Sequence, residues 1–213
     1  MSTCRPLIIT ILVCFLILAA GCTVRDTTTG NSPSKTARLP FESLVLTPSD
    51  VPPNFTLVES RAKNVTEVGN LALSLGWQQG YVVRYARSPE GVSGNAVILQ
   101  TIVVYPEKNI PAIAELIERQ ERSDSNMTFS NLSSPSLGNY SHAFSGKENL
   151  RIINKSDNVF LLEYDSTRET IQQDFIEIIF SKGNILEIIR LTGPESDFST
   201  LSNLAQKAYS KIP

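Results

Sequence analysis

From Phe41 onward, the chain alternates between two spacings of apolar residues. In some stretches they occupy every second position, as in β-strands, and in others they recur every three or four positions, as in amphipathic helices. The first spacing predicts strands over residues 55–62, 77–87, 95–105, 140–145, 150–154, 159–165, 174–181 and 185–192. The second predicts helices over residues 64–75, 109–123 and 198–212, and one helical turn at residues 47–50.

The strand at residues 95–105 is apolar on both faces, because Val97 and Val103 point one way while Ile98 and Ile102 point the other. We therefore expect both of its sides to be covered, by helices or by a second subunit. The predicted helices fall between blocks of strands, and a hairpin followed by a helix occurs twice. This order predicts an α+β fold with an antiparallel sheet flanked by helices, in an αβα sandwich-like arrangement.

The N-terminus has the pattern of a lipoprotein signal peptide. A short segment with Arg5 precedes an apolar run over residues 7–20, which is shorter than the roughly 20 residues that a membrane-spanning helix needs. The run ends in Leu18-Ala19-Ala20-Gly21-Cys22, where small residues precede a cysteine. We predict cleavage before Cys22 and lipidation of its thiol. The alternative is an uncleaved signal anchor that runs to about Val24.

This interpretation divides the chain into three parts. Residues 1–21 are the signal peptide, and residues 22–40 are the lipidated cysteine with a flexible tether rich in Ser and Thr. Residues 41–213 form a single extracytoplasmic domain. The protein is therefore expected at the cell membrane, held by the lipid on Cys22 and facing the exterior.

Composition excludes several classes of chemistry. The cysteines Cys4, Cys14 and Cys22 all lie in or at the end of the leader, so the domain itself has no thiol for a disulfide, a metal site or catalysis. The chain has 19 basic and 21 acidic residues and no basic run, so it is not expected to bind nucleic acid. We expect no metal and no cofactor.

Asn-x-Ser/Thr sequons are the second notable feature. They are candidate N-glycosylation sites of an exported protein, and they occur at Asn54, Asn64, Asn126, Asn131, Asn139 and Asn154. The alternative is that a surface rich in Ser, Thr and Asn generates sequons by chance. An archaeal surface lipoprotein would explain both the leader and the sequons, whereas a bacterial one would explain only the leader.

Three segments resemble parts of small prokaryotic secreted lipoproteins of unassigned function. They are Leu46-Thr-Pro-Ser-Asp-Val-Pro-Pro-Asn-Phe55, Leu137-Gly-Asn-Tyr-Ser-His-Ala-Phe144 and Lys182-Gly-Asn-Ile-Leu186. The order of hairpins, strands and helices is also similar to that of the Mog1/PsbP-like domains. This resemblance implies a binding or accessory role, and its motifs are turn and packing residues that specify no chemistry.

Two sites are candidates for chemistry or recognition. His142 is the only histidine and would be the base of a hydrolase, although a strand histidine beside Tyr140 and Phe144 is more often a packing residue. Trp77 and Tyr81 would form a binding patch that stacks on a sugar or anchors a partner, unless Trp77 fills the edge of the core.

A further segment, residues 123–138, is long and polar, and its pattern fits either a loop or an edge strand.

The sequence therefore favours a non-catalytic, membrane-anchored binding or accessory module. Its partner would be another envelope protein or, second, a small apolar ligand. Two alternatives remain at this point: an envelope hydrolase that uses His142, and a structural surface component.

Overall fold

The computed structural model describes residues 40–87, 96–124, 127–152, 162–163, 170–193 and 196–213. The chain divides into two compact units, Met1–Arg38 and Leu39–Pro213, and every described residue belongs to the second. Its helical elements are α1 (Phe41–Leu44), η1 (Val65–Glu67), α2 (Asn70–Ser74), η2 (Glu107–Asn109), α3 (Ile110–Ser123) and α4 (Phe198–Lys211). Its strands are β1 (Thr56–Ala62), β2 (Gln79–Arg87), β3 (Ala96–Val104), β4 (Met127–Leu132), β5 (Tyr140–Ile152), β6 (Leu162–Glu163), β7 (Thr170–Lys182) and β8 (Ile185–Thr192).

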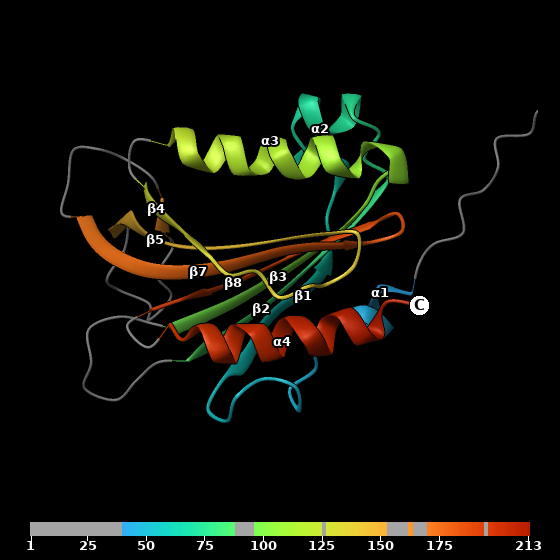
Figure 1. The fold of residues 1–213 in the computed structure, drawn as a ribbon. Helices are drawn as coiled ribbons and strands as arrows, with labels where there is room; N and C mark the ends of the chain where they lie inside the picture. The colour runs from blue at the N-terminus through green and yellow to red at the C-terminus, as the bar shows by residue number, and fades with distance from the viewer. Residues whose placement is uncertain (1–39, 88–95, 125–126, 153–161, 164–169, 194–195) are drawn as a thin grey trace, which may run out of the picture. The chain divides into compact units, whose positions relative to one another are not determined.

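The described strands form one antiparallel sheet (Figure 1). Their order is β1-β2-β3-β8-β7-β5-β4, and β6 pairs with β5 beside this path. The C-terminal hairpin β7–β8 therefore lies at the centre, next to β3, while β1 and β4 end the two sides. The predicted mixed α+β class, with a largely antiparallel sheet, is confirmed.

Apolar side chains gather in two clusters, one on each face of the sheet. The first contains α1, α4 and the inward residues of the central strands, among them Ile98, Ile102 and Ile178. The second contains α3 with Val103, Phe175 and Leu186. Figure 1 shows α4 beside one face of the sheet, and α2 and α3 beside the other.

Several predicted elements are confirmed with small changes at their ends. Helix α4 begins after the N-cap Asp197, whose side chain accepts from two backbone N–H groups, and it buries the predicted residues Leu201, Leu204, Ala205 and Ala208. The β7–β8 hairpin turns at Gly183, which has a φ of 58°. The link between β2 and β3, residues 88–95, lies outside the described residues.

The predicted helix at residues 64–75 is wrong as a single element. Asn64 and Glu67 close a capping box around the short η1, whose C-cap Val68 is extended, and α2 begins only after Gly69. As a result, Leu71 is 55% exposed, although the helical spacing predicted its burial.

The single turn predicted at residues 47–50 is present as one hydrogen-bonded turn that does not continue into a helix, and in it the Asp50 N–H donates to the Thr47 carbonyl at 2.9 Å. The Asp50 carboxylate accepts from the N–H and the hydroxyl of Thr47 and stabilises this turn. The helix at the start of the domain is α1, Phe41–Leu44, which the sequence analysis did not predict.

The two strands predicted at residues 140–145 and 150–154 are one long strand, β5, whose part beyond residue 152 is outside the described residues. Of the strand predicted at residues 159–165, only β6 is described. The segment at residues 123–138, which fitted either a loop or a strand, contains the edge strand β4.

Candidate functional site

Trp77 and Tyr81, the predicted binding patch, belong to different clusters. Trp77 packs against the cluster that contains α3, whereas Tyr81 packs against the cluster that contains α4. The Tyr81 ring stacks on Phe41 with centroids 5.5 Å apart, and its hydroxyl lies 3.2 Å from the Ser60 hydroxyl. The structure therefore does not bring the two aromatic residues into one patch.

His142 lies on β5 and faces α3, where it contacts a few other polar side chains. Its Nδ1 lies 3.3 Å from Oε1 of Glu118, and the Tyr140 hydroxyl donates to the same oxygen. Burial and the neighbouring Glu118 raise the pKa of Tyr140. The Phe144 ring lies beside the imidazole, at 5.8 Å between centroids.

The other nitrogen of His142, Nε2, is buried and has no hydrogen-bond partner. A general base must reach the proton that it removes, and a buried nitrogen does not meet a substrate at the surface. The contacts of His142 instead connect β5 to α3, which is the packing role that the sequence left open.

The described sequon asparagines are all exposed: Asn54, Asn64, Asn131 and Asn139. At two of them the orientation of the amide is fixed, because a group that only donates faces the oxygen. The Thr66 N–H donates to Asn64 Oδ1, and Arg122 Nη2 donates to Asn131 Oδ1 at 2.5 Å. The other two sequons, at Asn126 and Asn154, lie outside the described residues.

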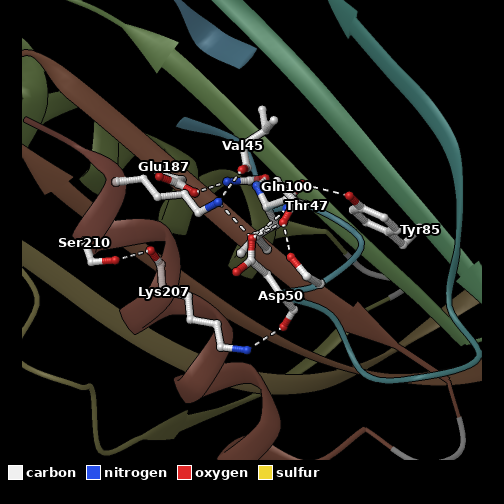
Figure 2. Close-up of polar contacts among 11 residues, drawn as sticks. Val45, Thr47, Asp50, Tyr85, Gln100, Glu187, Lys207 and Ser210 are labelled. Atoms are coloured by element: carbon white, nitrogen blue, oxygen red, sulfur yellow. Dashed lines mark hydrogen bonds and ion pairs between the residues drawn. The ribbon is translucent and has the colours of Figure 1, made fainter. Parts of the chain in front are cut away.

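A buried polar network crosses the core beneath α4 (Figure 2). Gln100 of β3 accepts from the Leu46 N–H through Oε1 and donates through Nε2 to Glu187 Oε1 of β8, at 2.7 and 2.5 Å. Glu187 is fully buried, and its Oε2 has no hydrogen-bond partner. Burial raises the pKa of Glu187 to about 8, against the opposing effects of Gln100 and Lys211.

Hydrogen bonds in the same region connect the first residues of the domain to α4. Lys211 Nζ donates to the Val45 carbonyl and to Asp50 Oδ2, at 3.0 and 2.8 Å, and Lys207 Nζ donates to the Asp50 carbonyl. Although burial acts to raise it, the hydrogen bonds from Lys211 and Thr47 lower the pKa of Asp50 to about 2. These contacts hold residues 45–50 in place.

A second buried cluster centres on Arg190 of β8, on the opposite face. Its guanidinium contacts Glu177 at 2.5 Å, Glu121 at 2.8 Å and Glu148 at 3.2 Å, and it lies over the Phe175 ring at 4.5 Å. Burial and the neighbouring Glu177 raise the pKa of Glu121 to about 8. Because Glu121 belongs to α3 and the other three charged residues belong to strands, the cluster connects that helix to the sheet.

Neither cluster was predicted from the sequence, although the chain carries a signal for both. Gln100, Glu177, Glu187 and Arg190 are polar residues that lie within largely apolar runs of the sequence. A charge within such a run is either paired or protonated in the core. Among the described residues, no group of three or more His, Cys, Asp or Glu side chains is placed to hold a metal ion. Because the contacts of both clusters join strands and helices of the domain to one another, we assign both clusters to the stability of the fold.

Recognition at the surface has a better candidate in β1, which ends one side of the sheet. Of the described strands, only β2 pairs with it. Its residues are all exposed except Glu59, which is partly buried. Arg61 Nε contacts Glu59 Oε1 at 2.7 Å, and Arg84 Nη2 of β2 approaches Glu59 Oε2 at 3.6 Å.

Exposed apolar side chains follow this edge. Within the described part of the chain, the large apolar residues that are exposed all fall between residues 57 and 73, and they are Leu57 (50%), Val58 (59%), Val65 (52%), Leu71 (55%) and Leu73 (37%). Single exposed apolar residues are normal on a protein surface. Their restriction to β1 and to the two short helices after it marks this segment as unlike the rest of the described surface. We call residues 56–74 the β1 edge segment.

No family model, no curated protein and no solved structure matches this chain. None of the helices that the structure describes is both long enough and apolar enough to cross a membrane.

Proposed function

We propose that this protein is a membrane-anchored, non-catalytic binding module that faces the exterior of the cell and docks a protein partner along β1. In this account the lipid on Cys22 holds the protein at the membrane and residues 23–40 are the tether. The domain is an αβα sandwich-like body, in which two apolar clusters, one with α4 and one with α3, support the sheet from both faces.

The observation that carries the proposal is the open edge of β1. An edge strand has unpaired N–H and C=O groups, which bind a strand from a partner by backbone hydrogen bonds. Exposed Leu57 and Val58 lie on the edge strand itself, and Val65 follows it. Backbone pairing supplies affinity in this mode, and the neighbouring side chains supply specificity.

The geometry favours a protein partner over the other candidates. Two surface pockets of about 300 and 290 Å³ each include charged side chains, Lys147 and Asp174 in one and Asp50 and Lys207 in the other, whose desolvation a small apolar ligand would not repay. The hydrolase alternative depends on His142, whose Nε2 is buried. A purely structural component would have no need of an apolar open edge.

The sequons fit an exterior location. The exposed amides of Asn54, Asn64, Asn131 and Asn139 are available for N-glycosylation, and Asn126 and Asn154 are further candidates. Because the Asn64 and Asn131 oxygens accept hydrogen bonds, their Nδ2 atoms, which would carry the glycan, are directed away from those donors.

Site-specific photo-crosslinking in native membranes tests the docking edge. A photoreactive amino acid replaces Leu57 on β1 or, as the matched control, Thr128 on the opposite edge strand β4. We expect a discrete protein adduct from position 57 and none from position 128. Equal labelling at both positions, or no adduct at position 57, would contradict the proposal.

A further inference from the structure

We propose that the partner of β1 is a second copy of this chain. The two copies of β1 pair antiparallel about a two-fold axis that lies midway between their Ser60 residues. This inference rests on the proposed docking role of β1 and names its occupant.

Symmetry restricts how two copies of β1 can pair. Residues that lie opposite each other in an antiparallel pair share a face of the sheet, and side chains alternate between faces along each strand. When both strands are identical and the axis is perpendicular to the sheet, paired residue numbers must therefore add up to an even number. The axis then lies midway between the same residue of the two copies, so that this residue is opposite itself.

The charges on β1 determine which residue lies opposite itself at the axis. An axis through Ser60 places Glu59 of each copy opposite Arg61 of the other, which gives two attractive pairs. An axis through Glu59 or through Arg61 instead places two like charges directly opposite each other. The register centred on Ser60 is thus the one in which the charges of this strand complement themselves.

Within a single chain, the side chains of Glu59 and Arg61 already contact each other. Arg61 Nε and Glu59 Oε1 are 2.7 Å apart, so both side chains reach the same side of the strand. Arg61 Nη1 also contacts Glu67 Oε2 at 2.8 Å. The side chains of Arg61, Glu59 and Glu67 are 47%, 23% and 37% exposed, so exchanging these contacts for pairs between copies leaves no charge buried alone. Arg84 at 3.6 Å from Glu59 adds a second positive charge beside the junction.

The exposed apolar residues fit the same arrangement. The register of β1 with β2 shifts between Leu57 and Glu59, so regular pairing between copies is expected only from Glu59 onward. In an antiparallel pair, the start of one strand lies beside the end of the other. Exposed Leu57 and Val58 of one copy therefore approach the end of β1 in the other, after which exposed Val65 follows.

A glycan on Asn64 would compete with this dimer. In the register centred on Ser60, Asn64 follows the end of β1 and lies near the start of β1 in the other copy, where a bulky sugar would separate the strands. The experiment therefore uses the unglycosylated full chain, produced in a host without N-glycosylation and kept in detergent micelles.

Cysteine crosslinking tests the register. The variant S60C places two thiols at the symmetry axis, where opposite Cα atoms of an antiparallel pair lie within disulfide range. The control S130C places a thiol on β4, and the unmodified chain reports any crosslinking through Cys4, Cys14 or Cys22. We expect S60C to give at least about fivefold more covalent dimer than either control, and equal yields would overturn the proposal.

A charge exchange then tests the pairing itself. In the S60C background, E59R and R61E each place like charges opposite one another, so each alone should lose most of the dimer. An equimolar mixture of the two, and the double exchange E59R/R61E, restore opposite charges and should restore the crosslink. A yield of covalent dimer that is the same in all of these variants would overturn the register.

The two proposals fail in different ways. If position 57 labels a different protein in membranes while S60C yields no covalent dimer, the docking edge stands and the second copy is excluded. If neither experiment gives a product, both proposals are wrong.

Discussion

Gln100 Nε2 donates a hydrogen bond to Glu187 Oε1 at 2.5 Å, between the central strands β3 and β8 and inside an apolar cluster. Glu187 is completely buried, and its second oxygen has no partner. A buried carboxyl in this position is more stable with its proton than without it. The core of the domain therefore contains a group whose charge state changes near neutral pH.

The first prediction is that the fold is more stable at pH 5 than at pH 8. The pKa of Glu187 is raised from 4.5 to about 8, so the folded state keeps a proton that the unfolded state loses. The contribution to the free energy of unfolding is fully present below pH 4.5 and falls as the pH rises toward 8. Glu121, whose pKa is also raised to about 8, acts in the same direction.

Urea unfolding at pH 5 and pH 8 measures this slope. The variant E187Q keeps the shape of the side chain without the ionisation, so it should lose a few kcal/mol of the difference between the two pH values. The exposed Glu115 supplies the control E115Q, which should retain the slope. A variant E187Q with an unchanged slope would show that Glu187 is charged in the fold.

A second prediction concerns Arg190. Its removal leaves Glu148 and Glu177 buried without their cation, so R190Q should lower the free energy of unfolding at pH 7 by about 3–5 kcal/mol. The control is R119Q, which breaks an exposed pair with Glu115 and should cost less than about 0.5 kcal/mol. Similar losses for both variants would contradict a structural role for the buried cluster.

The sequence predicts a segment well when local residue spacing determines its structure. It predicts a segment poorly when pairing with a distant strand determines its structure. Helix α4 was predictable down to its buried residues, because Leu201, Leu204 and Ala208 follow helical spacing from a cap at Asp197. Strand β5 was split in the prediction, because its Gly-Lys-Glu-Asn stretch is typical of a turn. Pairing with β7 continues through that stretch and overrides the local preference.

The candidate site was hard to predict for the same reason, because it depends on contacts between distant parts of the chain. The sequence indicated Trp77 and Tyr81 as one candidate binding patch because they are close along the chain, but Trp77 precedes the first residue of β2, so strand alternation does not relate the two. Likewise, the position of β1 at the edge depends on the order of strands in the sheet. No local pattern in residues 56–62 contains that order.

Gly146 gives a third prediction, about close packing within β5. A Cβ atom at this position would lie 2.0 Å from the Thr128 carbonyl oxygen and 2.8 Å from the Phe175 ring. The variant G146A should therefore lower the free energy of unfolding by about 3 kcal/mol. A Cβ at Gly69 meets nothing within 4 Å, so thermal unfolding of G69A should stay close to that of the unchanged protein.

The fourth prediction separates His142 from function. Because its ring packs on Phe144 and its Nδ1 faces Glu118, H142A should lower the free energy of unfolding by about 1–2 kcal/mol. It should leave photo-crosslinking from position 57 unchanged. A folded H142A chain that loses its adduct would instead bring His142 into the binding surface.

The central claim is that β1 is a binding edge, and amide hydrogen exchange tests it most directly. Exchange of the full chain is measured in vesicles from its native membranes and again after extraction and dilution in detergent. The account predicts that the outward amides of β1 are protected in the membrane and exchange rapidly after dilution, while those of β4 stay the same in both. Equal and rapid exchange of β1 in both conditions would contradict the account.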